Sequence, residues 1–530
     1  MRLRSLLTYI GVMPANRIFH RLIGARMSHI LWAQSRPADA QRGVYLGLIH
    51  GLASTAYGKS LGIYGASDIA RRKDFIRRVP IVTYDELKPW ILRARDGERN
   101  ILWPGLTTWF AQSSGTTSDH HKWLPVTREA LHGGHYKGGK DLLAQYCHQV
   151  PAARLYHGKH LILGGSSALV QEGQCALKGD LSAIIVRHLP PWCEARRTPN
   201  RGIALMSNWE EKVEAVARAT AKEDVRILAG VPSWMSLVAQ RVLQVTGKSN
   251  LREVWPNLWL YMHGGVGFEP YRDTFENLIP DVPGRPSMHF LETYNASEGF
   301  FAYQEDLNRN DMALLMDHGI FYEFVPMDEL DKTDPHALEF REVEVGQTYA
   351  MVISTNAGLW RYLLGDLVTI TSKVPLRIQV AGRISSHLNL AGEELMQHQT
   401  DLAVARVCRA LGTEIYNYMA GPVVDEFGKP IGHEWALEFQ SERIHPDANS
   451  LAKRLDEELK GLNGDYKAKR TANLALQMPL IRVVPSGTFD TWLEANHRLG
   501  GQHKVPRLTH SAIILASVIQ ASKQELSPTC

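Results

Sequence analysis

The chain has few cysteines and no long apolar run, and both absences restrict where and how it can work. Its five cysteines are scattered over 530 residues, are odd in number and form no C-x-x-C pair. This distribution argues against a disulfide framework and a structural zinc site, and it is typical of a reducing compartment. No segment approaches the roughly 18 apolar residues that a bilayer span needs. We therefore expect a cytoplasmic protein with no membrane partner.

A strong excess of one charge is also missing. The 59 lysines and arginines are balanced by 55 aspartates and glutamates, for a formal net charge of +4. Proteins that bind nucleic acid usually concentrate a larger positive excess on one face. The basic clusters at residues 71–73 and 467–470 are broken by apolar or acidic neighbours, which indicates solvated helix faces. We therefore expect no nucleic-acid partner.

Repeats and low-complexity tracts are absent, and the 44% apolar and 22% charged composition is that of an ordinary globular protein. A chain of 530 residues exceeds what one core accommodates, which predicts at least two domains. The first ten residues combine a basic start with a short apolar run. Because Pro14 interrupts the run and no small-residue cleavage site follows, we expect an N-terminal helix rather than a signal peptide.

The order of apolar patterns predicts an α/β fold with two parts. Residues 1 to about 100 are mainly helical in pattern, and from about 150 to 370 short apolar runs alternate with helical patterns, which is typical of a large layered domain with helices packed on β-sheets. The runs that we expect to be strands are residues 160–163, 182–186, 225–228, 258–262, 349–354 and 367–370, and the helices include residues 210–218 and 233–245.

The last 140 residues or so have a different pattern. Strand-like runs at residues 414–420 and 434–439 are followed by a helix over 446–462, whose leucines form one stripe, and by a strand within 474–484. This order predicts a small, mobile α+β domain. Glycine-containing segments near residues 383–392 indicate a hinge, and we place the large domain at residues 1–385 and the small domain at 386–530.

One loop carries the composition of a phosphate-binding site. Between residues 111 and 122, five hydroxyl side chains surround a single glycine and a lysine follows. Glycine allows backbone N–H groups to turn toward an anion, hydroxyls add further donors, and lysine neutralises phosphate charge. The alternative is a polar surface turn, because the same residues favour loops. The candidate phosphate ligands are Ser113, Ser114, Gly115, Thr116, Thr117 and Lys122.

Other apparent motifs do not meet their own requirements. Gly58-Lys59-Ser60 ends like a Walker loop, but alanine occupies position 53, where that motif needs glycine. Gly265-Val266-Gly267 is not a dinucleotide fingerprint, because Pro270 replaces its third glycine. His132 and His135 have helical spacing but no carboxylate or cysteine at ligand spacing, so we expect no metal site there.

The loop S-S-G-T-T followed by K-x-x-P resembles the phosphate-binding signature of the adenylate-forming superfamily, which includes acyl-CoA synthetases, peptide-synthetase adenylation domains and luciferases. Its local form is most similar to the auxin-responsive Gretchen Hagen family of acyl acid amido synthetases, in a style closer to bacterial members. Pro125 completes the pattern, whereas Asp119 departs from it, since many members carry glycine there.

Two further motifs follow in the family's order. Residues 293–300, T-Y-N-A-S-E-G-F, resemble the second motif; the resemblance implies that Tyr294 lies on the adenine ring, that Ser297 contacts the α-phosphate and that Glu298 holds Mg²⁺. Residues 360–366, W-R-Y-L-L-G-D, resemble the third, which implies that Asp366 accepts hydrogen bonds from the ribose. The alternative for Asn295-Ala296-Ser297 is a glycosylation sequon, which is irrelevant in a cytoplasmic protein.

Weaker similarities complete the set. Residues 263–270 resemble the adenine-side loop, which implies that Gly264 and Gly265 lie beside the adenine ring. Residues 381–393 have the spacing of the inter-domain hinge, which places Arg383 near the ribose, although serines stand where acidic residues are usual. Residues 501–507 resemble the C-terminal lysine loop, and Lys504 is the candidate that bridges the attacking carboxylate and the α-phosphate; its alternative is a surface lysine.

The resemblance implies that the chain uses ATP and Mg²⁺ to adenylate a small carboxylic acid and then transfers the acyl group to an amino acid while the small domain rotates. An acyl-CoA ligase with the same first step is an alternative, and an inactive ATP-binding sensor or scaffold is a second. The acid is not identified, because the aromatic residues near the motifs fit either an acyl pocket or the core: Trp109, Phe110, Tyr136, Phe300, Phe301 and Tyr303.

Overall fold

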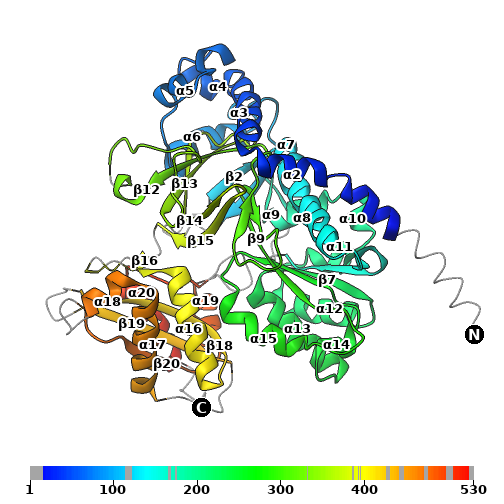
Figure 1. Cartoon of the computed structure of the whole chain (residues 1–530), viewed down its shortest axis with the longest axis vertical. Helices are drawn as coiled ribbons and strands as arrows, with labels where there is room; N and C mark the ends of the chain where they lie inside the picture. Colours follow the sequence, from blue (N-terminus) through cyan, green and yellow to red (C-terminus); the bar gives the residue numbers. More distant parts are fainter. Residues whose placement is uncertain are drawn as a thin grey trace, which may run out of the picture.

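A computed structural model describes most of the chain. The described residues are 16–113, 122–164, 169–172, 176–330, 332–384, 387–388, 390–391, 393, 395–424, 430–440, 447–470, 476–496 and 505–524. They form a large domain and a small C-terminal domain, which lies at the lower left in Figure 1. This arrangement confirms the predicted fold class.

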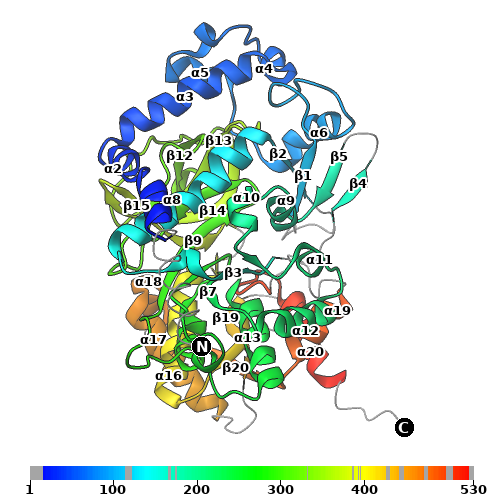
Figure 2. The ribbon, with the colours of Figure 1, turned by 90° about the vertical axis from the view of Figure 1, so that its right-hand side faces the viewer.

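The N-terminal helices pack on the outside of the large domain, as Figures 1 and 2 show. Residues 16–24 are helical. Pro89 lies inside helix α6 (Tyr84–Arg95), five residues after the helix begins. Asp85 and Glu86, which precede Pro89, therefore lie in the first turn of α6. The other helices of this region are α2 (Met27–Ser35), α3 (Pro37–Ala53), α4 (Ala56–Ser60) and α5 (Arg72–Arg78).

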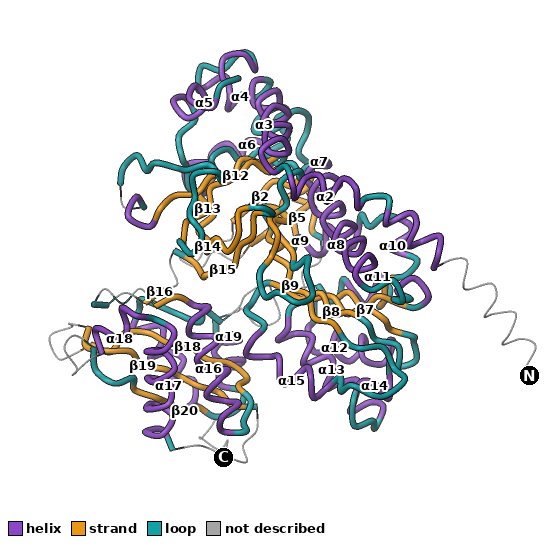
Figure 3. The backbone as a smooth tube through the Cα atoms, in the orientation of Figure 1, coloured by secondary structure: helices purple, strands orange, loops and turns teal. Residues whose placement is uncertain are grey.

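An 11-stranded mixed sheet forms the centre of the large domain, drawn in orange in Figure 3. Its order is β12-β13-β14-β15-β11-β10-β9-β8-β7-β3-β6, and the five strands from β6 to β9 are parallel. The strands are β3 (Lys159–Ile162), β6 (Arg197–Thr198), β7 (Val225–Gly230), β8 (Leu260–Gly264), β9 (His289–Ala296), β10 (Gly299–Tyr303), β11 (Met312–Leu314), β12 (Ile320–Pro326), β13 (Thr348–Thr355), β14 (Tyr362–Lys373) and β15 (Leu376–Arg383).

Helices cover this sheet, and a second sheet adjoins it. The second sheet has the order β2-β1-β5-β4, in which β1 (Trp109–Ser113) and β2 (Lys122–Val126) are antiparallel. The remaining main elements of the large domain are β4 (Val170–Glu172), β5 (Ala176–Gly179), α7 (Arg128–Ala130), the π-helical turn η2 (Leu131–His135), α8 (Tyr136–Gln149), α9 (Leu181–Arg187), α10 (Pro191–Glu194), α11 (Arg201–Ala204), α12 (Trp209–Thr220), α13 (Pro232–Thr246), α14 (Leu251–Val254), η4 (Glu269–Tyr271) and α15 (Arg272–Leu278).

One predicted strand is wrong. Residues 182–186 lie in the helix α9, which packs on β1. The run S-A-I-I-V is rich in β-branched residues, but a short apolar run has no periodicity that separates a strand from a buried helical segment. Burial of Leu181 and Ile184, three residues apart, gives the helix its inner face.

The small domain has its own core and a three-stranded sheet, as predicted for an α+β module. Helix α17 buries Leu451, Leu455 and Leu459 as one stripe. The elements are β16 (His387–Leu388), β17 (Leu395–Met396), α16 (Gln397–Leu411), β18 (Ile415–Val424), β19 (Pro430–Phe439), α17 (Ala448–Leu462), α18 (Gly464–Arg470), β20 (Leu480–Val484), α19 (Thr488–Ala495) and α20 (Ala512–Gln524).

The two domains contact each other through α16 and the segment that contains η4 and α15. Arg409 forms an ion pair with Asp273 at 3.0 Å, and the hydroxyl of Thr274 donates to a carboxylate oxygen of Glu414 at 2.8 Å. Within the described part of the chain, every helix is too short or too polar to span a bilayer.

Candidate active site

The ends of β8 and β9 bring two of the predicted motifs together. These strands are parallel, and Gly264 is paired in register with Thr293. In open α/β sheets, ligands bind where the carboxyl ends of parallel strands meet. A Cβ on Gly264 would lie 2.3 Å from the carbonyl oxygen of Thr293, so only glycine allows this approach. Gly265 follows with a φ of +84°, a backbone conformation that also favours glycine.

The second and third motifs meet through a direct hydrogen bond. The hydroxyl of Tyr294, on β9, donates to Oδ2 of Asp366, on β14, at 2.6 Å. The other oxygen, Oδ1, lies 3.2 Å from Nε of Arg383, the register partner of Asp366 on β15. The Asp366 side chain is nearly buried, whereas the Arg383 side chain is 48% exposed. The structure thus places three predicted nucleotide-binding residues in one contact chain.

Glu298 occupies the tight turn between β9 and β10, next to Ser297. Burial and the charge of Asp366 raise the pKa of the Glu298 carboxyl to about 7, while Arg383 and Lys122 act in the opposite direction. The raised pKa reflects two carboxylates that share a poorly solvated site with too little positive charge. A bound cation would compensate for this deficit.

Lys122 begins β2 and is the register partner of Ser113 at the end of β1. Its Nζ lies 5.4 Å from the centre of the Tyr84 ring, and its charge acts on Glu298. The two ends of the predicted phosphate loop therefore lie side by side, facing the second motif. Some predicted site residues lie outside the described residues: Ser114, Gly115, Thr116, Thr117 and Lys504, together with Asp119.

Three segments of the chain match the domains of one family. Residues 26–284 match the GH3 family N-terminal domain, residues 313–383 match its central domain and residues 398–513 match its C-terminal domain. The chain belongs to the GH3 family. GH3 denotes the Gretchen Hagen family, so the resemblance found in the motifs is confirmed.

Plant GH3 proteins are similar to the chain over most of its length. Indole-3-acetic acid-amido synthetase GH3.3 of Arabidopsis thaliana is 24% identical over an alignment of 527 positions, and the match covers 86% of this chain and 86% of the relative. The 4-substituted benzoates-glutamate ligase GH3.12 of the same plant is 23% identical over an alignment of 529 positions, and the match covers 82% of this chain and 87% of the relative.

Solved structures share the fold of this GH3 chain. The GH3.15 acyl acid amido synthetase superposes with a TM-score of 0.75 at 15% identity and covers 94% of this chain and 96% of its own. A 2-hydroxyisobutyryl-CoA ligase in the postadenylation state has a TM-score of 0.58 at 13% identity and covers 93% and 94%. The GH3 chain therefore shares its overall fold with these two ligases.

Two tyrosines of the site were not found from the GH3 motifs. Tyr362 is buried, and the charges of Glu298 and Asp366 help to raise its pKa, which places its hydroxyl near both carboxylates. Its position within the third motif, four residues before Asp366, could have indicated that Tyr362 belongs to the site. Tyr84 comes from α6, far away in the sequence, where no motif indicates it.

Arg361 fixes the start of β14, the strand that carries Asp366. It is buried with a φ of +41°, which is unusual for a residue with a side chain. Its Nε donates to Glu323 at 2.9 Å and its Nη1 donates to the carbonyl of Val79 at 2.9 Å. This buried ion pair holds the strained residue in place and thereby fixes the direction in which β14 leaves the turn.

The histidines of η2 serve the packing of the site. His135 is buried, its Nδ1 lies 2.9 Å from Oδ1 of Asn295 in the second motif, and burial lowers its pKa to about 4. A neutral imidazole therefore supports the backbone beside Tyr294. His132 contacts Tyr136 edge to face at 5.3 Å between ring centres.

The aromatic residues considered for an acyl pocket separate into two groups. Phe110, Phe300, Phe301 and Tyr303 are buried in the core, whereas Trp109 and Tyr136 are only half-buried. Trp109 lies 4.5 Å from His188, centre to centre, and the hydroxyl of Tyr136 donates to the carbonyl of Ile185 on α9. Of the six, only Trp109 and Tyr136 are partly exposed.

The residues of the site fit ATP and Mg²⁺. Glu298 supplies hard carboxylate oxygens, which Mg²⁺ prefers, and Mg²⁺ usually takes one or two carboxylates together with substrate phosphates. In the described part of the chain, no three His, Cys, Asp or Glu side chains gather as a metal site. This is consistent with an ion held by one carboxylate and the nucleotide.

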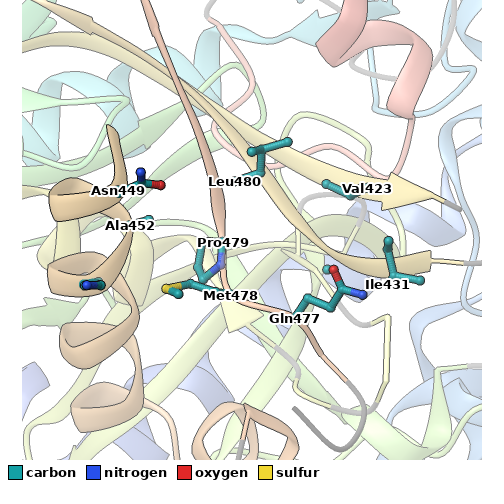
Figure 4. Close-up of a pocket in the computed structure, with 10 residues that line it drawn as sticks. Val423, Ile431, Asn449, Ala452, Gln477, Met478, Pro479 and Leu480 are labelled. Carbon is teal, nitrogen blue, oxygen red and sulfur yellow. The ribbon is translucent and has the colours of Figure 1, made fainter. Parts of the chain in front are cut away.

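A cavity of about 410 Å³ lies in the small domain, between α17 and the edge of the sheet (Figure 4). None of the predicted site residues lines it. Its lining residues are Val423, Ile431, Gly432, Asn449, Ala452, Lys453, Gln477, Met478, Pro479 and Leu480.

Proposed function

We propose that this GH3 chain is an ATP-dependent acyl acid amido synthetase, a ligase that forms a carbon–nitrogen bond. It adenylates a carboxylic acid with release of pyrophosphate and transfers the acyl group to an amino acid. The main support is the convergence of three separate motifs on Glu298, whose pKa is raised first by burial and then by the charge of the nearby Asp366. The names of the plant relatives agree with this activity.

The site residues take the roles that their positions allow. Asp366, with Arg383, accepts the ribose hydroxyls, and Tyr294 with Gly264 and Gly265 frames the adenine. Lys122 holds the pyrophosphate side, and Ser297 contacts the α-phosphate. Lys504 bridges the carboxylate and the α-phosphate. The residues of the proposed phosphate loop that act with Lys122 are Ser113, Ser114, Gly115, Thr116 and Thr117.

The first step joins two anions, so positioning and electrostatics dominate it. The acid carboxylate attacks the α-phosphorus in line, and the bond to the pyrophosphate oxygen breaks. Mg²⁺, when bound at Glu298, supplies positive charge to the phosphates. In the second step the amine attacks the acyl carbonyl, AMP leaves, and the amine loses a proton. No thiol of the chain is needed.

The acceptor separates this proposal from its nearest rival. An acyl-CoA ligase needs the same adenylation residues, and the fold is shared with 2-hydroxyisobutyryl-CoA ligase. We favour an amino acid, because the plant relatives that match 82% or more of this chain are named for amide formation or for a glutamate acceptor. An inactive ATP-binding sensor is the remaining alternative, and the presence of Lys122, Glu298 and Asp366 argues against it.

We also propose a boundary at residues 385/386 and a cytoplasmic location. The boundary is supported by one large apolar core before Arg383 and another after His387, although a smaller cluster joins Met396 to Ala381 across it. The location rests on the cysteines: Cys147 and Cys408 are buried as free thiols, and burial raises the pKa of each to about 12. Unreactive core thiols are ordinary in a reducing compartment.

Acid-dependent ATP–pyrophosphate exchange with Mg²⁺ tests the function. A panel of aryl, indolyl and fatty acids should contain at least one acid that supports exchange, and amino acids should then release AMP and yield an amide. Release of AMP by coenzyme A but by no amino acid would establish the rival ligase. Binding of ATP without exchange for any acid would establish the sensor.

A further inference from the structure

The first described helices of the chain have two apolar faces. The inner face buries Phe19, Ile23, Met27 and Ile30 at helical spacing. Phe19 stacks on Tyr156 at 5.0 Å between ring centres, so this face is well packed. A helix with a single apolar face needs a single packing partner, and the large domain already provides that partner.

The outer face carries a second apolar set that the described residues leave uncovered. Ile18 and Leu22, four residues apart, are 56% and 68% exposed, and on α2 Leu31 and Trp32 are 49% and 37% exposed. Ile18 and Leu22 each precede a buried residue by one position, so they lie about 100° around the helix from the buried stripe. The helices that carry the exposed set lie at the outside of the large domain (Figure 2). Contiguous exposed apolar side chains of this size mark interaction sites.

The charge around this face is mainly positive, although Asp39 is exposed at the start of α3, three residues after Arg36. Residues 1–38 contain six arginines and no aspartate or glutamate. Arg17 and Arg21 are exposed next to Ile18 and Leu22, and Arg36 is exposed one turn after Trp32.

Three acids of the neighbouring elements are already paired with cations. Asp141 binds Arg26 at 2.8 Å, and Glu194 binds Arg197 at 2.8 Å. Asp317 lies 2.6 Å from the ammonium group of Lys137. The positive charge of the outer face is therefore not neutralised from below. The near-zero net charge of the whole chain concealed this local excess.

We propose that this outer face, defined by Ile18, Leu22, Leu31, Trp32 and the exposed arginines, docks the protein on an anionic lipid surface. Helices that lie in a membrane interface combine arginines or lysines with leucine, isoleucine and tryptophan, and their binding adds apolar burial to attraction by anionic headgroups. Tryptophan is enriched at the level of the headgroups. The proposal departs from the sequence-based expectation of no membrane partner, because it adds peripheral attachment to a chain whose described helices cannot span a bilayer.

Two other occupants fit the face less well. A second copy of the chain would bring two arginine-rich faces together across a symmetric interface, and like charges at such an interface are unfavourable. Nucleic acid would satisfy the arginines but would leave Ile18 and Leu22 without apolar contacts. An anionic bilayer satisfies both sets. This inference does not depend on the proposed enzymatic activity.

Flotation of the full chain with phospholipid vesicles tests the proposal. The wild type should float with vesicles that contain roughly one quarter phosphatidylglycerol, less so at high salt, and not with phosphatidylcholine alone. Ile18→Ser/Leu22→Ser should weaken binding more than about tenfold by loss of apolar burial. Arg17→Gln/Arg21→Gln should weaken it about 30-fold.

Matched controls come from exposed residues elsewhere. Ile513→Ser, at a position that is 82% exposed on α20, and Arg71→Gln, on a side chain that is 73% exposed, should bind as the wild type does. Unchanged thermal transitions should show that all variants are folded. A wild type that does not float, or controls that lose binding equally, would overturn the proposal. So would a wild-type dimer that Ile18→Ser/Leu22→Ser converts to a monomer, because a second copy would then cover the face.

Discussion

Nη2 of Arg507, in the small domain, donates a hydrogen bond of 3.0 Å to the hydroxyl of Tyr271, in the large domain. Arg507 is buried, lies over the ring of Tyr418 and forms an ion pair with Asp401 at 3.8 Å. Because Arg507 follows Lys504 by three residues, this contact holds the chain that leaves the proposed lysine loop against the large domain.

Tyr271→Phe should slow adenylation about tenfold, because a hydrogen bond to a charged group contributes about 1.5 kcal/mol. ATP–pyrophosphate exchange measures the effect. Tyr303→Phe is the control, since the buried hydroxyl of Tyr303 has no hydrogen-bond partner among the described residues. A loss confined to amide transfer from preformed acyl-AMP would assign the contact to the second step instead.

Glu298 should make both stability and metal use depend on pH. Folding raises its pKa from 4.5 to about 7, so its contribution to stability is fully present below about pH 4.5 and is lost as pH rises through 7. Without Mg²⁺, the melting temperature of Glu298→Gln should fall less between pH 5 and about 8 than that of the wild type. Exchange by the wild type should rise through about pH 7, because only the ionised carboxylate binds the ion.

Glu292→Gln separates this role from burial alone. Burial raises the pKa of Glu292 to about 7 as well, but its charged neighbours are Arg272, Asp401 and Glu269. This variant should keep its Mg²⁺ requirement, whereas Glu298→Gln should lose about 100-fold in rate. Equal losses in both variants would contradict a metal role for Glu298.

Asp366→Asn should abolish recognition of the ribose hydroxyls. The wild type should discriminate against 2′- or 3′-deoxy-ATP, because a site built to bind a hydroxyl rejects the analogue that lacks it. The variant should lose most of that discrimination and raise KM for ATP more than about tenfold. Discrimination that is retained in the variant would remove Asp366 from the ribose site. Comparison of kcat/KM for the three nucleotides measures it.

Gly264→Ala should disrupt the site through the backbone. The added carbon would lie 2.3 Å from the carbonyl of Thr293, so β8 and β9 must separate. We expect a melting temperature lower by several degrees and little exchange. Gly139→Ala, in α8 with nothing within 4 Å, should instead stabilise the protein by about 0.5–1 kcal/mol. Normal activity of Gly264→Ala would show that the strands can adapt.

The Arg361–Glu323 pair should behave as a unit. Arg361→Met leaves a buried carboxylate and should destabilise the large domain by about 3 kcal/mol, the low end of the range because Arg72 remains 3.4 Å from Glu323. Arg361→Met/Glu323→Leu should recover much of the loss. Scanning calorimetry measures both, and equal destabilisation by the single and the double variant would contradict this account.

Residue patterns located the motifs and several of the strands, but they did not predict the contacts between the motifs. Asp366 and Glu298 were found because each lies in a contiguous pattern of residue types. The hydrogen bond between Tyr294 and Asp366 spans 72 residues and depends on the pairing of strands that no local pattern encodes. Arg507 was noted only as the last residue of the C-terminal loop motif. Its contact could not be predicted, because its partner Tyr271 lies 236 residues away in the sequence.

The errors have equally local causes. Residues 182–186 have the composition of a strand, and only packing on β1 makes them the helix α9. The outer face of the N-terminal helices was hidden because the composition averages its arginines with acids elsewhere, and exposure of Ile18 and Leu22 is known only once the inner stripe is packed.

The pairing of β14 with β15 has a consequence for domain movement. β15 ends at Arg383, and the next N–H, that of Ile384, donates to the carbonyl of Gly365 at 2.8 Å, beside Asp366. If the proposed function is correct, the start of the hinge to the small domain is therefore hydrogen-bonded to the motif that binds the ribose. The release of the nucleotide and the rotation of the small domain would then both act on this hydrogen bond. A substitution in the ribose motif should therefore also change the movement of the small domain.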